Sequence, residues 1–119
     1  QRTMDFLYTV WEKDGKFYGA YDRNWKGTVK ARCLVGEAQA SVLWMKMSRF
    51  WGDSRYRSAA LSINRSLKQT QDLATPHSGL HGGIPGSYPI TGRYCFLKYP
   101  NWAAKFYADA LLMEMLADS

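Results

Sequence analysis

Long apolar runs and cysteines are scarce in this chain of 119 residues. No stretch reaches the roughly 18 to 20 apolar residues of a transmembrane helix, so we expect no membrane span. Cys33 and Cys95 are the only cysteines, and they lack the paired spacing of a disulfide framework. The first residues also lack the apolar core and small-residue cleavage site of a signal peptide. These absences favour a reducing compartment, and we expect a cytoplasmic protein.

Motifs for metals and nucleotides are missing as well. His77 and His81 are four residues apart, but they lie in a Gly/Pro-rich segment where helical ligand geometry does not apply. The run GGIPGS at residues 82–87 lacks the lysine of a phosphate-binding loop and contains Pro85, which has no N–H. We therefore expect no metal site and no cofactor.

Basic residues outnumber acidic ones by 16 to 10, which gives a net charge of +6, but the basic residues are dispersed along the chain. Basic residues are scattered from Arg2 to Lys105, and the densest group lies on what the pattern indicates is one solvated helix face: Arg55, Arg57, Arg65 and Lys68. A scattered distribution is typical of a solvated surface rather than of a phosphate-binding patch. Nucleic-acid binding is therefore the weakest of three functional hypotheses.

What the chain does contain is an unusual segment at residues 76–102. It holds all four prolines, five of the ten glycines and both histidines. Connections longer than about 12 to 15 residues are uncommon in compact domains and are usually functional or disordered. This one carries Ile84, Tyr88, Tyr94 and Phe96, among other apolar side chains, so we expect it to pack against the protein.

Three helices are predicted around this loop, over residues 33–51, 55–71 and 101–116. The first and third are apolar on nearly every side, which predicts burial on every side, whereas the second is amphipathic. Pro100 stands where a helix start tolerates it. Before them, the break at Asp14-Gly15 fits either the end of a helix or the turn of a strand pair over residues 8–21. The sequence leaves both open.

Alternation of buried and half-exposed helices predicts two concentric layers, an inner and an outer one. The segments CLVGEAQASVLWMKMSRFW, GGIPGSYPI and YPNWAAKFYADAL, within residues 33–117, resemble a bacterial family with the α/α-toroid architecture of terpenoid cyclases, protein prenyltransferases and six-hairpin glycosidases. The family is similar to proteins encoded among polysaccharide-biosynthesis genes. The segment WEKDGKFYG resembles the sequence between outer and inner helices of that superfamily.

This resemblance implies a mainly α fold, a partial α/α toroid with alternating inner and outer helices and one long Gly/Pro-rich loop. A full toroid needs about six helical hairpins, more than a chain of 119 residues supplies. We therefore expect residues 1–119 to be one helical domain that is a fragment of a toroid or one part of a homo-oligomer. The predicted loop would close over the end of a cavity bordered by Glu37 and Asn101.

The first functional hypothesis is a carbohydrate-binding or carbohydrate-active cleft, in the latter case glycoside hydrolase-like or lyase-like. Helical spacing puts Glu37, Ser41, Trp44 and Ser48 on one stripe and Asn101, Lys105 and Asp109 on another, and we predict that both face the cavity. The predicted catalytic residues are Glu37, Asp109 and His81, two carboxylates and a proton carrier. The predicted oligosaccharide-binding residues are Trp44, Tyr88, Tyr94, Asn101 and Trp102.

Structural roles compete with each of these assignments. A buried Glu37 could bind backbone N–H groups, and Asp109 has Lys105 as an ion-pair partner one turn away. Aromatic rings are more often core than ligand platforms. The second hypothesis is accordingly a noncatalytic binding or assembly module that self-associates.

Overall fold

The computed structural model of the protein describes residues 1–117, and these form four helices and three strands. The helices are α1 (Arg2–Asp14), α2 (Leu34–Trp51), α3 (Ser54–Lys68) and α4 (Asn101–Ala117). The strands are β1 (Tyr18–Tyr21), β2 (Gly27–Cys33) and β3 (Ser87–Tyr88), which make one antiparallel sheet in the order β1-β2-β3. The fold is therefore a small α+β fold.

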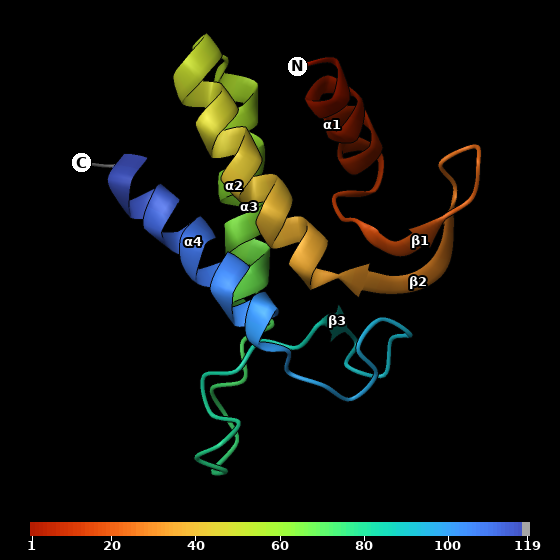
Figure 1. Ribbon diagram of the computed structural model, residues 1–119, viewed down its shortest axis with the longest axis vertical. Helices are drawn as coiled ribbons and strands as arrows, with labels where there is room; N and C mark the ends of the chain where they lie inside the picture. Colours follow the sequence, from red (N-terminus) through yellow and green to blue (C-terminus); the bar gives the residue numbers. More distant parts are fainter. Residues whose placement is uncertain (118–119) are drawn as a thin grey trace.

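Helix α2 runs through the middle of the molecule (Figure 1). It contacts α3 over most of its length, with α4 on one side and α1 and the β1-β2 hairpin on the other. The dimensions are 43 × 40 × 18 Å, so the molecule is a thin slab. One consequence is that both α2 and α4 keep a face outside the core.

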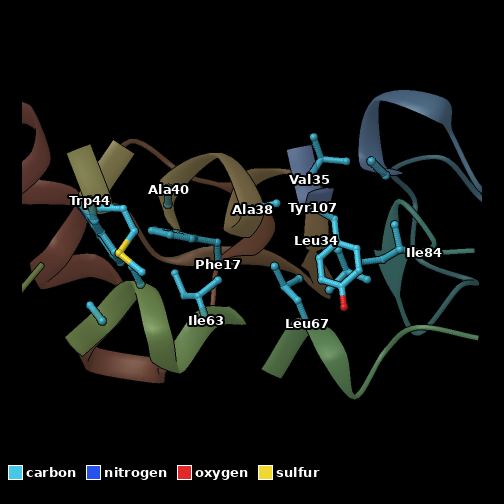
Figure 2. Packing of buried hydrophobic residues seen from close by; sticks show 14 of the residues in the cluster. Phe17, Leu34, Val35, Ala38, Ala40, Trp44, Ile63, Leu67, Ile84 and Tyr107 are labelled. Carbon is cyan, nitrogen blue, oxygen red and sulfur yellow. The ribbon is translucent and has the colours of Figure 1, made fainter. Parts of the chain in front are cut away.

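The core lies between α2 and α3, where Leu34, Trp44, Ile63 and Leu67 are almost fully buried (Figure 2). Rings from the N-terminal region complete it, and they include Phe17, whose ring centroid lies 6.1 Å from that of Trp44. Burial of each such side chain contributes about 1.5 to 3 kcal/mol, so this cluster dominates the stability.

Buried polar groups connect the helices across this core. The Ser41 hydroxyl on α2 donates to Asn64 Oδ1 on α3 at 2.6 Å, and the Asn64 amide donates to the Ala110 carbonyl and to Glu114 on α4. On the other side, the Tyr56 hydroxyl donates to Asp5 of α1 at 2.6 Å. These bonds fix the relative positions of helices that are distant in sequence.

The toroid predicted from the sequence is wrong, and so is the all-helical description. Residues 15–33 contain the β1-β2 hairpin, and the described residues form one slab instead of an inner and an outer ring of helices. The prediction failed because it took the apolar circumference of two helices as evidence that they are buried all round. In α2, Leu43 and Phe50 are exposed, and α4 buries only Ala103, Tyr107 and Ala110.

The local helix signals were read correctly. Gly52 ends α2 in the left-handed region with φ 72°, and the Asp53 carboxylate caps α3 by accepting from the Arg55 N–H. Gly15 ends α1 in the same way with φ 66°, which decides between the two readings of Asp14-Gly15 in favour of a helix end. The strand pair lies later than expected and turns over residues 22–26.

The long loop packs as predicted, but it does not roof a cavity at Glu37. Ser87 and Tyr88 form β3 and pair with Cys33 and Arg32 at the end of β2, while Ile84 joins the core. A Cβ on Gly86 would lie 2.7 Å from that of Cys95, so only glycine permits this close approach. The segment 73–82 projects beyond the helices (Figure 1).

Candidate functional site

A groove lies on the exposed side of the slab, between α2 and α4. Its volume is about 350 Å³. From α2 it is lined by Gln39, Val42, Leu43 and Lys46, and from α4 by Lys105, Phe106 and Asp109. Leu43 and Lys46 are three residues apart and share an exposed face of α2. Ser41 and Met45 are four residues apart and share the buried face.

A second open space adjoins this groove at the start of α4, with a volume of about 470 Å³. It is lined by Asn101, Trp102, Lys105 and Phe106. Since Lys105 and Phe106 line both spaces, the two adjoin, and together we name them the α2-α4 groove. Pro100 places Asn101 and Trp102 at the helix start, where the first turn leaves both side chains exposed.

Trp102 is held in position by the long loop. Its indole Nε1 donates to the Tyr94 hydroxyl at 3.0 Å, and the two side chains remain exposed by 48% and 36%. An exposed ring that is fixed by a hydrogen bond loses little conformational freedom on binding a ligand. Tyr94 and Trp102 thus form a hydrogen-bonded aromatic platform beside Asn101.

The charged groups of the groove are mostly basic. Lys105 and Asp109 form an ion pair one turn apart on α4, and Lys46 faces them from α2. Arg49 lies near by, in a further shallow depression that also includes Lys46 and Phe50. Three cations against one carboxylate give the groove and its rim a positive potential.

Glu37 is not part of this groove, contrary to the prediction. Its side chain is 1% exposed and is held by the Arg32 guanidinium, with Nε 3.0 Å from Oε1. The Phe17 backbone N–H also donates to Oε1, and Arg32 reaches across to the Ser66 hydroxyl at 2.8 Å. Glu37 is thus a buried carboxylate that joins β2, α2 and α3, and it has no contact with a ligand site.

Three other predicted site residues also lie elsewhere. Trp44 is fully buried, with its ring packed against Tyr8, and it does not face a cavity. His81 is in the projecting segment 73–82, where its ring bonds the Thr75 carbonyl. Tyr88 is exposed on β3 over the Arg32 guanidinium. Of the remaining predicted residues, Asn101 and Trp102 line one space, Tyr94 is hydrogen-bonded to Trp102, and Asp109 lines the adjoining groove.

Five residues that line the groove were not predicted from the sequence: Gln39, Val42, Leu43, Lys46 and Phe106. The signal for Phe106 was available, since it follows Trp102 by one helical turn. Lys46 had no such signal, because the apolar pattern of α2 predicts burial on every side and therefore no exposed position for a cation. Asn64 on α3 is fully buried, although it is polar. Its four-residue spacing from Ala60 was the signal for that position.

The titratable side chains that line the α2-α4 groove are Lys46, Lys105 and Asp109. No group of three or more His, Cys, Asp or Glu side chains within residues 1–117 could hold a metal ion. Burial raises the pKa of the Cys33 thiol, so this cysteine remains protonated and is a poor nucleophile.

Within residues 1–117, no helix is long and apolar enough to cross a membrane. The chain matches no known protein family, no curated protein and no solved structure.

Proposed function

We propose that this protein is a noncatalytic oligosaccharide-binding domain whose site is the α2-α4 groove, and that it prefers acidic saccharides. The observation that carries the proposal is the fixed platform of Tyr94 and Trp102. The C–H face of a sugar ring packs on such an aromatic surface and removes apolar area from water. The groove next to the platform has a volume of about 350 Å³, which we propose holds further sugar units.

Polar side chains lie where the hydroxyl groups of a sugar stacked on Trp102 would need partners. Asn101 offers both a donor and an acceptor beside the ring. One turn further along α4, Lys105 and Asp109 offer a second donor and acceptor, and Lys46 adds a cation from α2. The excess of cations over carboxylates favours a saccharide that carries carboxylate groups.

The arrangement supports binding more than hydrolysis. Glycoside hydrolysis uses two carboxyl groups on either side of one bond, about 5 to 9.5 Å apart. Among residues 1–117, Asp109 is the only carboxylate that lines the groove, and it is paired with Lys105. Glu37 is bound to Arg32 inside the protein and has no access to a substrate. His81 lies in the projecting loop segment and cannot serve as the second group.

Calorimetric titration with a panel of neutral and acidic oligosaccharides tests the proposal. We expect acidic oligosaccharides to bind the wild-type chain, and Trp102→Ala to weaken that binding about tenfold or more, since one buried ring contributes roughly 1.5 to 3 kcal/mol. Trp25→Ala is the matched control because Trp25 is equally exposed, at 47%, on the β1-β2 turn. Equal losses for both variants, or no binding by the wild type, would contradict the proposal.

Two further readouts separate this function from its alternatives. If the wild type turns over an oligosaccharide and Asp109→Asn lowers the turnover rate, the protein is an enzyme instead. Binding of single-stranded nucleic acid with a steep salt dependence, and with no effect of Trp102→Ala, would support a polyanion site. A saccharide-binding domain should show neither.

A further inference from the structure

Helix α4 has a second exposed surface, which adjoins the α2-α4 groove at Asn101 and Lys105. It consists of Ala104, Ala108, Leu112 and Met115, which follow one another at steps of four, four and three residues and so share one face. All four are exposed, Leu112 by 55% and Met115 by 68%. We name this surface the α4 stripe.

The α4 stripe carries no charge. The charged side chains of α4 are engaged elsewhere, Lys105 with Asp109 and Glu114 with Lys68 and Asn64. The chain as a whole has a net charge of +6, so two copies repel each other over most of their surfaces. An uncharged apolar face is therefore the surface on which two copies would meet with the least electrostatic repulsion.

The order of residues within the α4 stripe is self-complementary. The small side chains, Ala104 and Ala108, lie in its N-terminal half, and the large ones, Leu112 and Met115, lie in its C-terminal half. When two such helices pair antiparallel about a two-fold axis near residue 110, Ala104 faces Met115 and Ala108 faces Leu112 of the other copy. Large side chains then fill the space left by small ones at every level.

We propose that the protein forms a two-fold symmetric homodimer in which the α4 stripes of two copies pair antiparallel. Helix α4 lies along one edge of the slab, so two slabs can join there edge to edge (Figure 1). The antiparallel arrangement also opposes the dipoles of the two helices. Trp102 and Phe106 stay accessible in this dimer, because each lies two residues from Ala104 and therefore on the opposite side of α4.

The dimer is weak. Three turns of helix bury an area at the low end for specific interfaces, below about 1,200 Å² in total, which corresponds to dissociation constants in the micromolar range. Sedimentation equilibrium between about 5 and 500 μM should therefore show the mass rise from 13.6 kDa toward twice that value.

Ala108→Glu tests the surface, because it places a carboxylate opposite Leu112 of the other copy. We expect the dissociation constant to rise at least tenfold, with circular dichroism unchanged because position 108 is exposed. Ser62→Glu on the exposed side of α3 is the control, since it changes the net charge by the same amount away from the stripe. A wild-type chain that stays monomeric, or equal effects of both variants, would overturn the proposal.

The register has its own test. Chains with Ala108→Cys and chains with Leu112→Cys, mixed and mildly oxidised, should crosslink to each other faster than either chain crosslinks to itself. Parallel pairing would instead crosslink each variant to its own kind and would refute the antiparallel arrangement.

Discussion

Two carboxylates of this protein, Glu37 and Asp109, stand in similar sequence settings and in opposite environments. Each lies on an apolar helix and pairs with a cation close in sequence, Glu37 with Arg32 and Asp109 with Lys105. Glu37 is 1% exposed and also accepts a hydrogen bond from the Phe17 backbone N–H, whereas the Asp109 side chain is 37% exposed and its ion-pair partner lies on its own helix. The same chemical pair therefore supports the fold in one place and remains available to a ligand in the other.

The difference shows that a cation near a carboxylate does not by itself identify a site. Removing one partner of a buried pair leaves the other charge without water or counterion, which is costly. Removing one partner of an exposed pair changes little, because water replaces it. Burial thus separates the structural carboxylate from the one that can bind a ligand, and substitutions at the two positions should differ accordingly.

The largest effect is expected at Glu37. Glu37→Gln leaves the Arg32 guanidinium buried without its counterion, and we expect the free energy of unfolding to fall by about 3 to 5 kcal/mol. Urea unfolding followed by circular dichroism measures this loss. The double variant with Arg32→Met should lose less than Glu37→Gln alone, since no uncompensated charge remains. A loss below about 0.5 kcal/mol for Glu37→Gln would make the pair dispensable to the fold.

An intermediate effect is expected at the Tyr56-Asp5 contact, where a buried hydroxyl meets a partly exposed carboxylate. Burial of the phenol, with the hydrogen bond to Asp5, raises the pKa of Tyr56 from 10.0 to about 12. The folded state thus holds its proton more tightly than the unfolded state, so the stabilisation is complete below pH 10 and is lost between pH 10 and 12. We expect the loss to be about 2 kcal/mol.

Urea unfolding at a series of pH values tests this dependence against Tyr56→Phe, which has no ionisable hydroxyl. Tyr88→Phe is a suitable control, because its side chain is 50% exposed and the substitution removes a tyrosine hydroxyl away from the Tyr56-Asp5 contact. Parallel stability curves for the wild type and Tyr56→Phe above pH 10 would show that the Tyr56 proton does not contribute.

The smallest effect on stability is expected at Asp109. Asp109→Asn removes an exposed pair within one helix, and the free energy of unfolding should change by less than about 0.5 kcal/mol. Its effect on ligand binding should nevertheless be measurable, since the side chain lines the groove. We expect calorimetry to show a several-fold change in oligosaccharide affinity. A stability loss comparable to that of Glu37→Gln would remove the contrast between the two carboxylates.

Local features of the fold were predictable from the sequence, but its architecture was not. Gly52, Asp53 and Pro100 mark helix boundaries by their own backbone and side-chain chemistry, and the structure confirms all three. Which apolar faces meet depends on residues far apart in sequence. Phe17 covers Trp44 from a loop that no helical period describes, and this contact leaves Leu43 on the outside.

Only the part of the candidate site that lies on α4 was predictable from the sequence. Asn101, Trp102 and Asp109 share one helix, so their spacing alone brings them near one another. Tyr94 joins them through a loop whose path could not be read from the sequence. The sequence predicts that Glu37 and Trp44 line one cavity, because a polar stripe along an otherwise apolar helix usually needs water or a ligand as its neighbour. In the structure that stripe faces α3 and the rings of α1, where Arg32, Asn64 and Tyr8 satisfy or cover it.

The most direct test of the α2-α4 groove is an NMR titration of the tryptophan indole N–H signals with an acidic oligosaccharide. The five tryptophans report on different parts of the molecule, since Trp44 lies in the core, Trp25 at the β1-β2 turn and Trp102 at the groove. We predict that the Trp102 signal shifts in a saturable way while the signals of Trp44 and Trp25 stay in place. A saturable shift of Trp25 or Trp44 with an unmoved Trp102 would contradict the assignment of the binding site to this groove.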